Sequence, residues 1–381
     1  MRKLFLLAVF IVLCATSAFA AEPIKVGYLA PLTGVSAAFG VAEVNMAKIA
    51  VDEINKSGGV LGRPIELIIY DTKCRNEDAI NAVRRMVNSD NVVAILGSIQ
   101  SGIEIATASI SNNAKCPRIS TGATNPFVTV DTKGKVRPYS FRICFTDPYQ
   151  GAIAANLAYG DLGKRKAAIL YNVGSDYAQG LREYFTKDFT ALGGKIVADE
   201  GFMDADVDYR AQLTKIKSSG ADVLWLPGNG KDMALTIKQA EELGLKIAIV
   251  GSDSYGEFMN EIAGKAMAGT YWVNHTYMGD PNMAPIFERY KEVYKDECKE
   301  FIFATMAYDA TYWLVDAIKR AGKVDRQAIR DALEDTKNLK LRHFTLTLNP
   351  EDHNPYKKSG VILKVDEKDL KAKFFKKIAP K

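Results

Sequence analysis

Short apolar runs alternate with helical patterns along the first part of the chain. Runs at 24–29, 64–70, 91–97 and 117–119 have the length and composition of buried strands. Apolar residues recur at helical spacing over 41–54, 77–88 and from 103 onward. Strands that alternate with helices in this way predict an α/β fold whose parallel sheet is covered on both faces.

A second α/β series begins near residue 147, after the alternation pauses in a basic loop beyond Pro126. Its predicted strands are 167–171, 195–198, 222–226, 246–250 and 269–275. Its predicted helices are 150–160, a helix that follows a loop at 174–180, a helix that begins at 208, and 231–243. Helices near 284–297, 303–321 and 325–335 and strands at 342–348 and 360–365 complete the chain. The pattern shows no internal repeat of 20–50 residues, which excludes solenoids.

The first 20 residues have the features of a secretory signal peptide. Arg2 and Lys3 precede an apolar run from Leu4 to Leu13, and Ala18-Phe19-Ala20 forms a small-x-small cleavage site, so we expect a cut after Ala20. Leu13 stands where a lipid-attachment box needs a small residue, which argues against lipidation of Cys14. The mature chain is expected to be exported, soluble and periplasmic.

Length and charge narrow the class of protein. A chain of 381 residues exceeds what one core usually supports, so two domains are expected. Loss of Arg2 and Lys3 lowers the formal net charge from +5 to +3, and acids and bases are interleaved. A nucleic-acid surface would instead show a concentrated basic stripe.

Four cysteines remain after the expected cleavage: Cys74, Cys116, Cys144 and Cys298. An oxidising compartment permits disulfides, and four cysteines allow three fully paired connectivities, which the sequence leaves open. None has the close CxxC spacing of a metal or redox site, so neither a metal nor another cofactor is expected.

Two hydroxyl-rich turns follow neighbouring predicted strands. Ser101 lies in the turn after 91–97, and Thr124 lies in the turn after 117–119. The carboxyl ends of parallel strands meet at one edge of the sheet, where helix N-termini also present free N–H groups to an anion. The sequence therefore predicts an anion site here. The alternative is that Ser101 only caps a helix and Thr124 only serves a turn.

Catalytic constellations are absent from the sequence. It contains no GxSxG elbow and no GxxxxGK[ST] loop, and none of its three histidines lies in the two turns. His353 beside Glu351 and Asp352 has the composition of a metal site, but a solvated charged turn is the favoured interpretation. Asp71 at a strand end resembles a catalytic carboxylate, but a strand-end cap is the favoured interpretation. The chain is therefore expected not to be an enzyme.

The order of several motifs along the mature chain resembles the leucine/isoleucine/valine-binding family of periplasmic solute-binding proteins. These motifs are Ile24-Lys-Val-Gly with Pro31-Leu-Thr-Gly34, Gly58-Gly59-Val60, Ser98 to Gly102, Gly122-Ala-Thr124-Asn-Pro126, Tyr177 to Gly180, and Asp208-Tyr-Arg. The resemblance implies two Rossmann-like lobes with parallel-sheet cores, joined by three crossovers that form a hinge. When the family's division is applied to this chain, lobe one comprises residues 24–144 and 278–348, and lobe two comprises residues 147–275 and 353–381.

The resemblance also implies a site between the lobes for a small amino acid. Ser101, Gly122, Ala123 and Thr124 match the segment that holds the ligand's carboxylate and ammonium. From lobe two, Tyr177 matches an aromatic that covers the ligand, and Asp253 matches an acid that pairs with the ammonium. Phe39 matches an aromatic of the side-chain pocket; alternatively it packs on its own lobe. The alternative for Asp253 is a cap on a helix beginning near Tyr255.

Two positions depart from the leucine-binding pattern. Asn229 stands where close relatives carry a second tyrosine, and Gln100 stands where they carry the cysteine that would pair with Cys74. The predicted partners are an apolar or branched-chain amino acid and an ABC permease, with the protein acting as a monomer. An amide, an amine-free acid, or a sensing role at a membrane receptor remain as alternatives.

Overall fold

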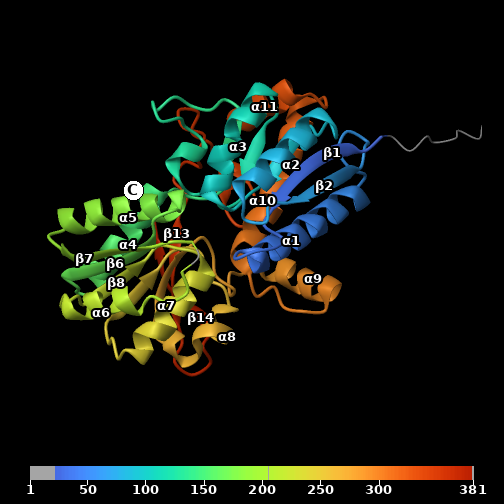
Figure 1. Ribbon diagram of the computed structural model, residues 1–381. Coiled ribbons are helices and arrows are strands. Elements are labelled where there is room, and N and C mark those ends of the chain that lie inside the picture. The colour runs from blue at the N-terminus through green and yellow to red at the C-terminus, as the bar shows by residue number, and fades with distance from the viewer. Residues whose placement is uncertain (1–21, 205, 380–381) are drawn as a thin grey trace, which may run out of the picture.

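The computed structural model describes residues 22–204 and 206–379. The predicted signal peptide, its cut after Ala20, and Cys14 lie outside these residues. Two lobes lie side by side, each built on one sheet (Figure 1).

The sheet of lobe one has five strands, all paired in parallel. In spatial order they are β2 (Ile65–Asp71), β1 (Ile24–Ala30), β3 (Ala94–Gly97), β4 (Arg118–Ser120) and β5 (Ser140–Arg142). Strand order reverses between β1 and β3, so the switch point of this sheet lies beside the turn that follows β3. In open α/β sheets ligands bind at such a point.

The sheet of lobe two has seven strands. In spatial order they are β14 (Ala372–Ile378), β13 (Gly360–Val365), β10 (Tyr271–Asn274), β9 (Ala248–Gly251), β8 (Val223–Leu226), β6 (Lys166–Asn172) and β7 (Lys195–Phe202). The five strands from β10 to β7 pair in parallel, whereas β13 and β14 are antiparallel to their neighbours. A two-stranded ribbon, β11 (Leu339–Lys340) with β12 (Thr345–Leu346), stands apart from both sheets.

Helices cover both faces of each sheet (Figure 1). Around lobe one these are α1 (Ala37–Lys56), α2 (Asn76–Asn88), α3 (Ser101–Asn113), α9 (Ala284–Tyr294), α10 (Phe301–Ala321) and α11 (Arg326–Glu334). Around lobe two they are α4 (Asp147–Asn156), α5 (Asp176–Ala191), α6 (Arg210–Ser218), α7 (Gly230–Glu242) and α8 (Met259–Ala263). Short helical turns η1 (Pro126–Val128), η2 (Leu157–Asp161) and η3 (Gly264–Met267) supplement them.

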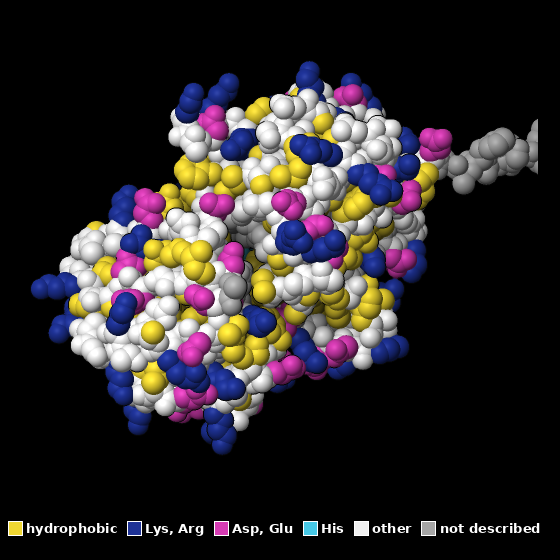
Figure 2. Space-filling view, in the orientation of Figure 1, with side chains coloured by type: hydrophobic (Ala, Val, Ile, Leu, Met, Phe, Trp, Pro, Cys, Tyr) yellow, Lys and Arg dark blue, Asp and Glu magenta, His cyan; other side chains and the backbone are white. Residues whose placement is uncertain are grey.

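The chain passes between the two sheets three times: after β5, after β10 and after β12. Parallel-sheet cores in two lobes confirm the predicted fold class. No helix in the described part of the chain is long and apolar enough to cross a bilayer. Acidic and basic side chains are interspersed over the face drawn in Figure 2.

Two local predictions differ from the structure, and some elements were not predicted. The segment 174–180 is largely helical, because Ser175 caps α5 by accepting a hydrogen bond from the backbone N–H of Ala178 at 3.2 Å. The predicted strand 342–348 contains only the two residues of β12. Strand β14 and the short helix α8 were not predicted. Three of the seven residues of β14 are lysines, so its sequence does not form the apolar run of a buried strand, and most of its side chains are exposed.

Candidate functional site

A cavity of about 620 Å³ lies between the lobes. The carboxyl ends of strands from both sheets contribute to it, together with the first turns of α3, α5 and α7. Six residues singled out from the sequence line it: Phe39, Ser101, Gly122, Tyr177, Asn229 and Asp253. The cavity is within the size range of small-molecule sites.

Ser101 joins the two turns of lobe one. It is the first residue of α3, and its hydroxyl accepts a hydrogen bond from the backbone N–H of Asn125 at 3.2 Å. The residue in the N-cap position is Gln100, which makes no side-chain cap bond, so the interpretation of Ser101 as a cap is wrong. Ser101 is therefore held at the positive end of a helix, where an anion is favoured.

The second turn is fastened to the first by Ser120. Its hydroxyl donates to the carbonyl of Ser98 at 2.8 Å and accepts from the N–H of Ala123 at 2.9 Å. Ala123 and Thr124 are fully buried and do not line the cavity, although they adjoin Gly122, which does. The Thr124 hydroxyl has no hydrogen bond partner within the described residues.

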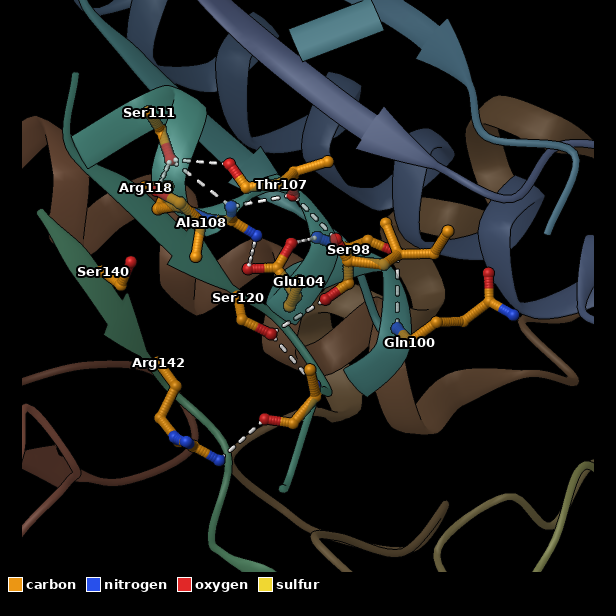
Figure 3. A network of polar contacts seen from close by, with 12 residues as sticks. Ser98, Gln100, Glu104, Thr107, Ala108, Ser111, Arg118, Ser120, Ser140 and Arg142 are labelled. Atoms are coloured by element: carbon orange, nitrogen blue, oxygen red, sulfur yellow. Dashed lines mark hydrogen bonds and ion pairs between the residues drawn. The ribbon is translucent and has the colours of Figure 1, made fainter. Parts of the chain in front are cut away.

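A buried ion pair lies beneath these turns. Glu104 accepts a hydrogen bond from the backbone N–H of Ser98 at 2.7 Å and pairs with Arg118, which also donates to Thr107 at 2.8 Å (Figure 3). Burial raises the pKa of the Glu104 carboxyl, and the Arg118 guanidinium opposes that rise. Removing either partner would leave an uncompensated buried charge. The pair therefore holds Glu104 in place, and Glu104 in turn fixes the Ser98 turn through its hydrogen bond to the Ser98 N–H.

Arg142 supports the second turn from the other side. Its guanidinium donates to the carbonyl of Ala123 at 2.9 Å and to that of Asn125 at 2.7 Å. Both acceptors are backbone groups, so Arg142 fixes the path of the chain next to Gly122. The two turns are thus braced by separate buried arginines, Arg118 and Arg142.

Aromatic rings form the apolar wall of the cavity. Phe39, in the first turn of α1, contacts Phe303 of α10 and Phe258 of lobe two edge to face, at centroid distances of 5.2 and 5.6 Å. The interpretation of Phe39 as packed only on its own lobe is therefore wrong. Phe303 also lines the cavity and was not identified from the sequence. A Cβ at Gly122 would lie 2.5 Å from the Phe303 ring, which explains the glycine.

Tyr177 and Asp253 face each other on the lobe-two side. The Tyr177 hydroxyl donates a hydrogen bond to the Asp253 carboxylate, and burial raises the pKa of that hydroxyl well above its usual value. Asp253 is 1% exposed. The nearest following helix, α8, begins at Met259 with Phe258 in the cap position, so Asp253 does not cap a helix.

Two further residues hold Asp253, and sequence reasoning missed both roles. Gln150 of α4 donates from Nε2 to Asp253 Oδ1 at 3.2 Å, and His275 Nε2 lies 2.8 Å from Oδ2. His275 directly follows β10, just as Asp253 follows β9, so its place at a strand end was a usable signal. Gln150 lies inside a helix and offers no such signal.

Asn229 directly precedes α7 and lines the lobe-two side of the cavity. Asp232, in the first turn of that helix, also lines it, and burial raises the pKa of its carboxyl to about 6. This part of the wall is therefore polar, unlike the wall formed by Phe39 and Phe303.

Metal-binding geometry and disulfides are absent from the described residues: no group of three or more His, Cys, Asp or Glu side chains could hold a metal ion, and Cys74, Cys116, Cys144 and Cys298 are free.

His353 is fully buried, 3.0 Å from Glu334 and 2.9 Å from the carbonyl of Ser140, so the predicted solvated turn is wrong for this residue. Asp71 accepts hydrogen bonds from the N–H groups of Leu32 and Lys73, both at 2.8 Å, which confirms its interpretation as a strand-end cap.

Comparison with known proteins places these features in context. Residues 23–369 match a family described as periplasmic binding protein. A leucine-, isoleucine-, valine-, threonine- and alanine-binding protein of Pseudomonas aeruginosa is 28% identical over 323 residues, 84% of each chain.

Solved structures of binding proteins are also similar to this chain. A leucine-binding protein from Thermotoga maritima has a TM-score of 0.86 at 31% identity, covering 94% of this chain and 99% of its own. A branched-chain amino acid transporter substrate-binding protein from Streptococcus pneumoniae, solved with isoleucine, has a TM-score of 0.84 at 29% identity, with the same coverage of both chains.

Proposed function

The chain belongs to the periplasmic binding protein family, and we propose that it is an extracytoplasmic solute-binding protein that captures a small amino acid between its lobes. One observation carries the proposal. The inter-lobe cavity has hydroxyl and backbone donors on one side, at Ser101, and an acid on the other, at Asp253. This polarity suits a zwitterion.

The ligand carboxylate is assigned to lobe one. The Ser101 hydroxyl and the first N–H groups of α3 lie at the cavity edge, next to Gly122 in the second turn. Ala123 and Thr124 are also proposed as ligand-binding residues from their match to the family's segment; in this structure both are buried next to Gly122, and the Thr124 hydroxyl lies close to the Asp147 carboxyl. Hydrogen bonds to an ionised partner contribute about 1.5–3 kcal/mol each.

The ammonium and the side chain are assigned to the remaining walls. Asp253 would pair with the ammonium, and Tyr177 would cover the ligand. Phe39 and Phe303 suit an apolar side chain, and the names of the relatives, which bind leucine, isoleucine and valine, support a branched-chain or other apolar amino acid. Asn229 makes the far end of this pocket more polar.

We extend the proposal to partners, location and domains. The protein is proposed to act without catalysis as a periplasmic monomer, released by cleavage after Ala20, and to deliver its ligand to an ABC permease. The proposed lobes are 24–144 with 278–348, and 147–275 with 353–381. The three crossings of the chain between sheets support these boundaries.

Mass spectrometry of ligand released from the purified protein, followed by a thermal-shift panel of free amino acids, tests the proposal. Ligand that binds only the native state adds about 2.7 kcal/mol of stability at a hundredfold excess over Kd. We expect apolar amino acids to raise Tm most. A protein stabilised only by amides or amine-free acids would contradict the amino-acid assignment.

A further inference from the structure

Asp253 is surrounded by hydrogen bond donors that carry no charge. Its Oδ1 accepts from Tyr177 and Gln150, and its Oδ2 lies 2.8 Å from His275 Nε2. Burial raises the pKa of the Tyr177 hydroxyl and lowers that of the His275 imidazole, so both are neutral near pH 7. Both carboxylate oxygens of Asp253 therefore contact only hydrogen bond donors, which suits a carboxylate in its acceptor-only form.

This arrangement places no cationic side chain of the described residues against Asp253. Within residues 22–204 and 206–379, no lysine or arginine pairs with it, and its one ion-pair candidate is the neutral His275. An ionised carboxylate offers about four lone-pair sites, of which the three donors occupy three. One site on Oδ2 is left, and Asp253 lines the cavity. The geometry therefore reserves one acceptor position on the Asp253 carboxylate for a cation in the cavity.

His275 is fixed by segments that connect the lobes. It follows β10 in the second crossing, is 1% exposed, and stacks on Phe145 of the first crossing with ring centroids 3.7 Å apart. Its ring centroid is 6.4 Å from that of Phe303, which belongs to lobe one and lines the cavity. The direction of the Nε2–H bond is thus set by the hinge.

Building on the proposed function, we propose that His275 is a positioning residue for ligand recognition. Its Nε2–H orients Asp253 so that the remaining lone pair of Oδ2 faces the ligand ammonium. Because the imidazole is neutral, it orients the carboxylate without competing as a counter-ion, as a lysine or arginine would. His275 itself does not line the cavity, so it acts through Asp253.

Two variants separate the donor from the ring. His275→Phe keeps an aromatic ring to stack on Phe145 but removes the N–H, whereas His275→Gln keeps a side-chain N–H donor and removes the ring. Each is titrated by calorimetry with L-leucine and with 4-methylpentanoate, which has the same skeleton without the amine. The measured quantity is the ratio of the two affinities, because a general packing defect lowers both affinities alike.

We expect His275→Phe to reduce this ratio at least about tenfold, which is 1.4 kcal/mol, while His275→Gln keeps most of it. Equal losses for both compounds, or equal ratios for both variants, would overturn the positioning role while leaving the proposed function standing. Wild-type protein that does not prefer L-leucine to 4-methylpentanoate would overturn the proposed function, and this inference with it.

A measurement on the wild-type protein keeps the test decisive if a variant does not fold. Nitrogen NMR of the His275 imidazole reports its tautomer directly. The expected state is neutral with the proton on Nε2, because Nδ1 has no hydrogen bond partner among the described residues. A proton on Nδ1, or a charged ring at pH 7, would contradict the inference.

Discussion

Asn125 connects the lobes directly, since its Nδ2 donates a hydrogen bond to the backbone oxygen of Asp176, 2.9 Å away in α5. The backbone N–H of the same residue donates to Ser101. The turn proposed to hold the ligand carboxylate therefore touches the opposite lobe. A ligand bound there would strengthen a contact between the lobes, and a ligand that stabilises one arrangement of the lobes more than another shifts a hinge equilibrium toward it.

Replacing Phe258 by alanine should favour the open arrangement. Its ring packs edge to face on Phe39 of the other lobe, and its loss removes apolar contact between the lobes. Solution scattering should give a larger radius of gyration for Phe258→Ala than for wild type, and L-leucine should reduce both. Phe375→Ala, an exposed ring on β14, serves as the control. An unchanged radius on ligand saturation in the wild type would count against hinge closure.

Ser101→Ala should weaken amino-acid binding by about 1–3 kcal/mol, the usual cost of leaving a buried polar group unpaired. Calorimetry with L-leucine measures the loss. Ser89→Ala, at an exposed position after α2, is a matched control and should bind normally. Unchanged affinity in Ser101→Ala would remove this hydroxyl from the carboxylate site.

Asp253→Asn should lower both affinity and stability. Removing one member of a buried charge pair costs about 3–5 kcal/mol, so binding of L-leucine should fall at least about a hundredfold. The ligand-free protein should also melt at a lower temperature, because the new amide places an N–H group against donors from Tyr177, Gln150 or His275. A less stable protein with normal affinity for L-leucine would contradict the ammonium role.

Glu300 should make closure depend on pH. It lies in lobe one beside the lobe-two loop, where the N–H of Phe258 donates to it at 3.4 Å, and burial raises the pKa of its carboxyl to about 8. The closed state therefore binds more protons than an open state in which this carboxyl meets water. Closure is favoured below the ordinary glutamate pKa and loses that advantage as pH rises through about 8.

The expected result is that affinity for L-leucine falls between pH 5 and 8.5 by up to about tenfold per pH unit, and that Glu300→Gln reduces this slope. Glu297→Gln, at an exposed position in the same segment, is the control and should keep the wild-type slope. Identical slopes in wild type and Glu300→Gln would exclude this carboxyl as the cause.

The sequence predicted elements whose signals are local. Strand β1 and helix α2 match the predicted ranges within one residue, because the apolar run and the apolar periodicity that specify them are encoded in contiguous residues. Strand β14 escaped prediction because it is lysine-rich and mostly exposed, and is specified by antiparallel pairing with β13 rather than by its own pattern.

The site was predictable where a residue ends a strand and not where contact depends on tertiary packing. Ser101 and Asp253 both follow strands, so their meeting at one cavity could be inferred. His275 also follows a strand, so its position carried the same signal. Gln150 and Phe303 instead lie in helices of different lobes, and only the folding of the whole chain brings them close to Asp253 and His275.

The central claim is that one zwitterionic amino acid is held by its two charged ends. Calorimetric titration of the wild-type protein with L-leucine, L-leucinamide and 4-methylpentanoate tests it most directly, because the second compound lacks the carboxylate and the third lacks the amine. The account predicts that each of the latter two binds at least about a hundredfold more weakly, a loss of roughly 2.7 kcal/mol. Equal affinity for all three compounds would contradict it.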